Sequence, residues 1–132
     1  MAAPGSPRHH LDHQCLHRAI YLAAAGILDG QDATTHWAWA GELERRGARY
    51  TEQRVVETGK VITAAGVSAG IDMALTLLAR LHGPQIAQGL QLAIEYDPQP
   101  PFDAGSPAMA PAHVVEAVRA TIGKRAGALL NS

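Results

Sequence analysis

The chain has 132 residues, of which 47% are hydrophobic and only 5% aromatic, and its formal net charge is -1. This length suits one domain with a core of Ala, Leu, Val and Ile, and the near-zero charge offers no field that would attract nucleic acid or an anionic membrane. A single cysteine, Cys15, excludes an internal disulfide framework, and no apolar run is long enough to span a bilayer, so a cytoplasmic location is expected.

The first part of the chain changes character at Ala19. Residues 1–18 are rich in Pro, Gly, His and Arg without a clear period, and are predicted to be irregular. A helix is predicted from there to the turn signals that begin at Gly26 and include Asp29-Gly30. A short buried strand over 33–35 and a helix over 37–46, closed by Gly47, follow.

The middle of the chain predicts a hairpin and a long helix. Two β-rich segments, 54–58 and 60–63, flank a glycine and read as antiparallel strands. A helix is predicted over 69–82, with Ser68 as its cap. Its apolar side chains fall on one face at helical spacing: Ile71, Leu75, Leu78 and Leu81.

The last part predicts two helices separated by a loop. Pro84 suits the first position of a helix that runs to about residue 95. Residues 97–107 contain four of the eight prolines and are predicted to be a loop. Pro111 opens a final helix that is expected to fray after Gly123, leaving 126–132 as a tail.

Strands that alternate with helices favour an α/β sandwich, in which sites lie at the carboxyl ends of strands. His36 and Gly66 both follow a predicted strand. An imidazole there suits general acid–base work, with the flanking Thr35 and Trp37 as candidate substrate-binding residues. The simpler interpretation is a helix-capping or core histidine, and the sequence alone favours it.

Asp72 and Cys15 are two further catalytic candidates. The first lies in the opening turns of the 69–82 helix, where the helix dipole favours a carboxylate, and it could also orient a histidine. The second lies beside His13 and His17, which suggests a Cys–His pair or a metal site. No acidic or cysteine ligand completes a zinc set, so a solvated histidine-rich tail is the preferred interpretation and no metal is expected.

Three separated segments resemble the ThiJ/PfpI (DJ-one) superfamily of class I glutamine amidotransferase-like proteins. The first combines residues 22–30 with 33–37, and the second is 63–72. The third, 91–107, resembles the isonitrile hydratase branch. The resemblance covers 19–125, in order and at the spacing of the family, and this range is predicted to be a partial domain.

The resemblance implies a flavodoxin-like three-layer α/β sandwich that usually forms homodimers and acts on a small molecule without a metal or organic cofactor. In the hydratase branch, a cysteine on a strained strand-to-helix elbow attacks the isonitrile carbon. Water then adds to give an N-substituted formamide, with help from an N-terminal acidic residue. His36 matches the histidine that follows the elbow helix, and its direct role differs among branches.

This sequence departs from the family at the elbow. The N-terminal half of the family domain has no counterpart, and Leu16 stands where the catalytic cysteine is expected, followed by His17 and Arg18. Cys15 is one place early. Codons that encode residues 14–18 can be read from their second bases as Ser-Val-Cys-Thr-Gly, the elbow sequence of the family. We therefore expect residues 1–18 to be an out-of-frame translation, which the nucleotide sequence of the gene would test.

Two classes of function remain open. One is a fragment of an isonitrile hydratase-like enzyme, and the other is a ligand-sensing domain related to AraC-type transcriptional regulators. A regulator would continue into a helix-turn-helix region, whereas this chain ends at Ser132, and its 98–107 loop resembles the stand-alone enzymes. The enzyme lineage is therefore favoured, with little or no activity expected from this polypeptide because position 16 lacks a nucleophile.

Overall fold

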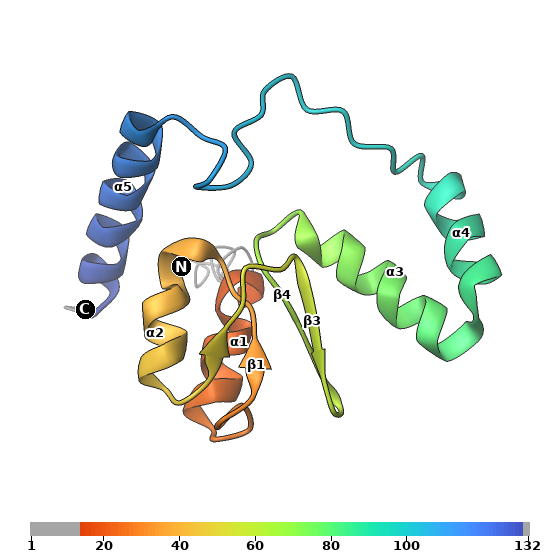
Figure 1. Ribbon diagram of the computed structural model, residues 1–132, viewed down its shortest axis with the longest axis horizontal. Coiled ribbons are helices and arrows are strands. Elements are labelled where there is room, and N and C mark those ends of the chain that lie inside the picture. The colour runs from red at the N-terminus through yellow and green to blue at the C-terminus, as the bar shows by residue number, and fades with distance from the viewer. Residues whose placement is uncertain (1–13, 131–132) are drawn as a thin grey trace, which may run out of the picture. The chain divides into compact units, whose positions relative to one another are not determined.

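The computed structural model describes the backbone of residues 14–130 and the side chains of residues 18–124. The chain divides into two units, one extending to Ile94 and the other beginning at Glu95 (Figure 1). Each unit is described separately. The secondary structure is mixed α/β with two small, incomplete sheets.

The first helix, α1 (Gln14–Ala24), begins before the expected start at Ala19. Residues 14–18 contain neither Gly nor Pro, so nothing in them interrupts a helix that the following alanines favour. The segment predicted to be irregular is therefore helical over 14–18, and residues 1–13 lie outside the described part. The predicted stop is confirmed, because Gly26 has a φ of 76° and its amide donates to the carbonyl of Ala23 at 2.9 Å.

Two very short strands form a parallel ladder. β1 (Asp32–Ala33) pairs with β2 (Arg49–Tyr50), which the sequence did not predict. The ladder stops at Ala33 although the strand was expected to reach residue 35. The amide of Thr34 donates to the Thr63 hydroxyl at 3.0 Å, so a side chain takes the place of a strand carbonyl there.

The predicted helix over 37–46 is present in two pieces. Its first turn is a 3-10 helix, η1 (Trp37–Trp39), which leads into α2 (Ala40–Arg45). α1, β1 and α2 surround the main core, in which Leu28 and Leu43 are fully buried. The other buried members are small or branched residues from α1, from β1 and from the link between α2 and β2: Ala19, Ile20, Ala23, Ala33 and Ala48.

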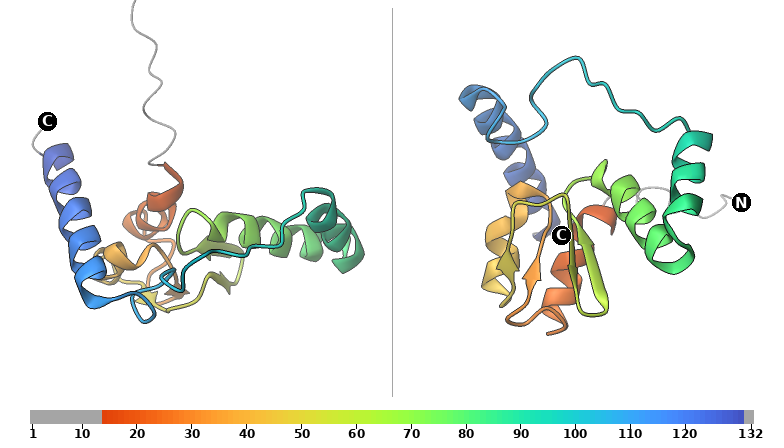
Figure 2. Two further views of the ribbon diagram at one scale, coloured as in Figure 1. Left: turned by 90° about the horizontal axis from the view of Figure 1, so that it is seen from above. Right: turned by 45° about the vertical axis from the view of Figure 1, so that its right-hand side comes forward.

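The predicted hairpin is confirmed. β3 (Val55–Thr58) and β4 (Val61–Ala64) are antiparallel, and Gly59, with a φ of 59°, makes the turn between them. The Thr58 hydroxyl donates to the carbonyl of Asp32 at 2.7 Å and links the hairpin to β1. Figure 2 shows the hairpin beside β1 from a second direction.

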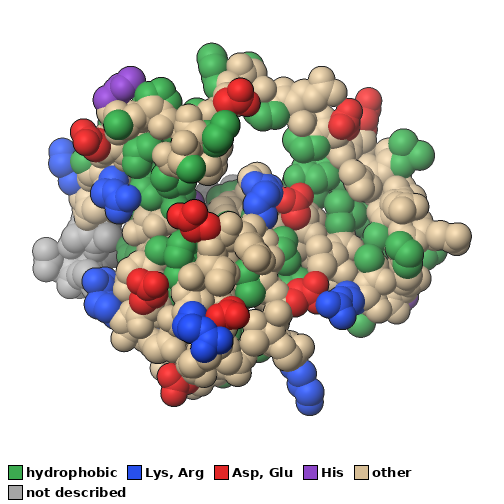
Figure 3. All heavy atoms as spheres, viewed as in Figure 1, with side chains coloured by type: hydrophobic (Ala, Val, Ile, Leu, Met, Phe, Trp, Pro, Cys, Tyr) green, Lys and Arg blue, Asp and Glu red, His purple; other side chains and the backbone are tan. Residues whose placement is uncertain are grey.

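Two helices complete the first unit. α3 (Ala69–His82) and α4 (Pro84–Ala93) meet at Gly83, whose φ is 89°. Pro84 occupies the first helical turn as predicted, but the Ser68 side chain forms no capping hydrogen bond. The predicted apolar face of α3 is only partly covered, since Leu81 is 67% exposed. Figure 3 shows hydrophobic side chains at the surface over α3 and α4.

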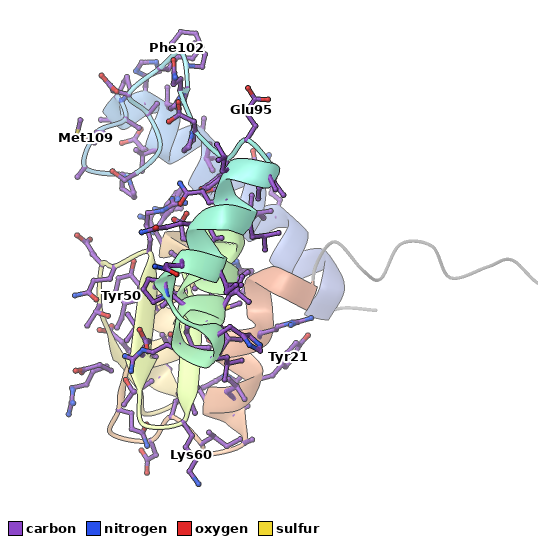
Figure 4. The ribbon with its side chains drawn as sticks, turned by 90° about the vertical axis from the view of Figure 1, so that its right-hand side faces the viewer. Tyr21, Tyr50, Lys60, Glu95, Phe102 and Met109 are labelled. Carbon is purple, nitrogen blue, oxygen red and sulfur yellow. The ribbon has the colours of Figure 1, made fainter. Side chains whose placement is uncertain are left out.

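The second unit contains a loop and one helix. Residues 97–111 form no helix or strand, as predicted for the proline-rich segment, and Figure 4 shows Phe102 and Met109 on it. α5 (Ala112–Leu130) then continues beyond Gly123, where fraying was expected, because alanine and leucine in the following turns favour the helix. No helix within residues 14–130 combines the length and the hydropathy that a membrane crossing requires.

Candidate functional site

His36 lies at the carboxyl end of β1, after two buried threonines. Its φ and ψ are -55° and 133°, so it is extended and precedes the first turn of η1. Its Nδ1 accepts a hydrogen bond from the amide of Ala38 at 3.3 Å. The interaction expected of a capping histidine is therefore present. Because Nδ1 is the acceptor, the neutral ring carries its proton on Nε2, and acid–base chemistry at this ring would involve Nε2.

Gly66, two residues after the end of β4, lies beside the His36 ring. A Cβ added to this glycine would lie 3.8 Å from the His36 Cδ2 atom. On another side of the imidazole, the Trp37 ring has its centroid 5.3 Å away, tilted by 31°. The sequence predicts that His36 and Gly66 each follow a strand, and in the structure the two residues lie next to each other.

The two predicted substrate-binding residues differ in accessibility. Thr35 is only 1% exposed, whereas Trp37 is half-buried beside the imidazole. The neighbouring Thr34 is fully buried, and its hydroxyl has no hydrogen-bond partner among the described residues. Trp37 is thus the more accessible of the two candidates.

Asp72 lies in the first turn of α3 and binds an arginine. The Nε atom of Arg54 donates to the Asp72 carboxylate, and its Nη2 atom donates to the Ser68 hydroxyl at 3.4 Å. The contact that the described residues show for this carboxylate is with Arg54, and its role in orienting a histidine stays a prediction. Arg54 was not among the site residues predicted from the sequence. The β3–β4 hairpin places Arg54 opposite the end of β4, and the packing of α3 on the hairpin then brings Asp72 within reach of its guanidinium.

Cys15 and position 16, where the resemblance places the nucleophile, both lie in the first turn of α1. Their side chains are outside the described part, as are the side chain of His17 and the whole of His13. The structure therefore leaves the Cys–His interpretation untested. Among the described residues, no group of three His, Cys, Asp or Glu side chains could hold a metal ion.

Comparison with known proteins relates the chain to one family over the segment that contains the site. A sequence model of the DJ-1/PfpI family matches residues 15–80. The isonitrile hydratase of Pseudomonas putida is 50% identical over 101 residues, which are 76% of this chain and 44% of the hydratase. The HTH-type transcriptional regulator CdhR of Pseudomonas aeruginosa is 39% identical over 71 residues, covering 52% of this chain and 21% of the regulator.

A solved structure agrees with these matches. The crystal structure of a ThiJ/PfpI family protein from Pseudomonas syringae superposes with a TM-score of 0.77 at 44% identity, covering 82% of this chain and 45% of that protein. The chain therefore spans less than half the length of these relatives. The matched residues 15–80 include α1, His36, Gly66 and Asp72. The chain belongs to the DJ-1/PfpI family.

Proposed function

We propose that this chain corresponds to the C-terminal part of an isonitrile hydratase-like protein with a flavodoxin-like three-layer sandwich. The observation that carries the proposal is the 50% identity to an isonitrile hydratase over 101 residues, a longer and closer match than the 39% over 71 residues to a regulator. The full protein would add water to an isonitrile and release an N-substituted formamide. Its partners would be this small molecule and a second copy of the chain, with neither nucleic acid nor a membrane.

The reaction needs a nucleophile and a route for protons. In the proposed chemistry, a thiolate forms a bond to the isonitrile carbon, which takes up a proton to give a thioimidate. Water then adds to this carbon, the carbon–sulfur bond breaks, and the thiolate is released with the formamide. His36 is the described residue best suited to move a proton, through Nε2, since its Nδ1 accepts from Ala38.

The polypeptide as it stands is proposed to be inactive. Leu16 has no nucleophilic atom, and adjacent positions of an α-helix differ by about 100° around its axis, so Cys15 cannot replace position 16. The glycine expected two places later is Arg18, which disfavours the strained elbow geometry. A Leu16→Cys change alone is therefore not expected to restore activity.

An isonitrile hydration assay tests both parts of the proposal. The purified 132-residue chain should not exceed the buffer rate, and the protein translated in the shifted frame, with its upstream sequence, should turn over an isonitrile. A matched variant of the latter with serine at the elbow cysteine should lose this activity. Turnover by the 132-residue chain would contradict the proposed inactivity, and no turnover by the shifted-frame protein would contradict the hydratase assignment.

The second candidate is a ligand-sensing domain related to AraC-type regulators, which the 39% identity to CdhR supports. A sensing domain would bind a small molecule without converting it. Calorimetric binding of isonitriles or other small ligands by the shifted-frame protein, without product formation, would favour this candidate over the hydratase.

A further inference from the structure

Two ion pairs connect the β3–β4 hairpin to α3, one near each end of the helix. Arg80, in the last turn of α3, lies 2.7 Å from the Glu57 carboxylate on β3. Arg54, just before β3, pairs with Asp72 in the first turn of α3. Both arginine side chains are more than half exposed, at 68% and 55%. Exposed ion pairs of this kind add little to the free energy of unfolding. If the loss of one pair affects the site more than the loss of the other, the cause must be the segment that the pair holds in place.

Arg54 holds the segment between β4 and α3 through its main chain as well as its side chain. Its carbonyl accepts a hydrogen bond from the amide of Ala65 at 2.9 Å. Its guanidinium donates to Ser68 and to Asp72. These contacts bracket residues 65–68, which we call the Gly66 turn, from the strand side and from the helix side.

The Gly66 turn lies next to one edge of the His36 ring, through Gly66 itself. Gly66 approaches the imidazole edge, with 3.8 Å between an added Cβ and Cδ2, and the Nδ1 bond to Ala38 fixes the ring on its other side. A shift of the turn would therefore change the space around Cδ2 and the neighbouring Nε2 atom. Arg80 has no comparable link to this turn, because Glu57 lies toward the far end of β3.

We infer that Arg54 is a positioning residue of this site, which sets the place of His36 by clamping the Gly66 turn between the start of β3 and the start of α3. The inference deepens the proposed function and rests on it for its chemical meaning. An arginine suits the task because its planar guanidinium can donate to Ser68 and Asp72 at the same time, which a lysine ammonium does less well.

Nuclear magnetic resonance of the 132-residue chain tests the inference without any assay of turnover. The measured signal is the nuclear Overhauser cross-peak between the His36 Hδ2 proton and the Gly66 Hα protons. Arg54→Gln should lose most of this cross-peak and shift the His36 ring resonances. Arg80→Gln, which removes the same charge from the other ion pair, should leave both unchanged. Urea midpoints should change equally in the two variants.

Arg54→Lys keeps the charge and guards against a glutamine variant that fails to fold. It should remain folded and lose only part of the cross-peak. An unchanged cross-peak in Arg54→Gln or in Arg54→Lys, or an equal loss in Arg80→Gln, would overturn the inference. Because the readout is geometric, this failure is distinct from a failure of the hydratase proposal, which is measured by turnover.

Discussion

The layer made by α1, β1 and α2 and the hairpin of helices α3 and α4 use similar apolar residues but bury them to different degrees. Leu28 and Leu43 in the layer are fully buried, whereas Leu81 and Leu90 in the helical hairpin are 67% and 48% exposed. The buried residues of these two helices are both alanines, Ala69 and Ala87. An apolar stripe on a helix thus contributes to stability only where another element covers it.

The difference predicts where the free energy of unfolding is concentrated. Leu43→Ala removes a fully buried side chain from the layer and should lower stability by about 3 kcal/mol, because the lost contacts leave a cavity. Leu81→Ala, the matched change on α3, should cost less than about 0.5 kcal/mol. Urea unfolding followed by circular dichroism measures both. Equal costs would show that the helical hairpin is covered in solution and would break the comparison.

Two glycines, one next to α2 and one in α4, test the same difference between the buried layer and the helical hairpin. Gly47 has a φ of 92°, and an added Cβ would lie 2.6 Å from the Asp29 carboxylate oxygen, so Gly47→Ala should cost about 2 kcal/mol. Gly89, inside α4, has open space around it, and Gly89→Ala should raise stability by about 0.5–1 kcal/mol through helix propensity. Thermal unfolding of the two variants should therefore move in opposite directions. A neutral Gly47→Ala would mean that this turn relaxes at no cost.

Two buried threonine hydroxyls differ in their hydrogen bonding. The Thr34 hydroxyl is buried without a partner among the described residues, so Thr34→Val should raise the free energy of unfolding by about 1 kcal/mol. Thr63→Val should lower it by about 1–2 kcal/mol, because the Thr63 hydroxyl accepts from the Thr34 amide and donates to the carbonyl of Val56. Chemical denaturation separates the two outcomes, and destabilisation by Thr34→Val would indicate a partner for its hydroxyl.

The smallest expected effect is electrostatic. Hydrogen bonding by Arg45, with a further contribution from Arg46, lowers the pKa of the Glu42 carboxyl below its ordinary value of 4.5, against a smaller opposing effect of burial. A lowered pKa in the folded state stabilises the protein above the ordinary value, and this contribution is lost as the pH falls through the folded pKa. Glu42→Gln should therefore cost about 0.5 kcal/mol at pH 7.

A pH series checks the origin of that cost. The difference between wild type and Glu42→Gln should shrink as the pH falls below 4.5. Glu44→Gln removes the same charge from α2 at a residue that takes part in no ion pair of the described region, and it serves as the matched control. If the difference in the free energy of unfolding between wild type and Glu42→Gln stays constant with pH, the cost comes from packing and not from the charge.

The candidate site was partly predictable. The sequence predicted that His36 and Gly66 each follow a strand, and the structure adds that the two residues lie next to each other. The partner of Asp72 was not predicted. The predicted hairpin places Arg54 opposite the end of β4, but the ion pair also depends on how α3 packs against the hairpin, which no periodicity records. β2 was missed for a similar reason, since a ladder of two residues has no alternation to detect.

The sequence by itself determined the family, through three segments that resemble it. It also determined the positions of the main helices and the hairpin, because glycine and proline signals and helical spacing act locally. It could not determine which apolar faces are covered, nor that Arg54 joins the start of β3 to the start of α3 beside His36. Those features depend on contacts between residues far apart in the chain. Only the tertiary structure decides them, since burial and ion pairing are properties of the neighbours that folding supplies.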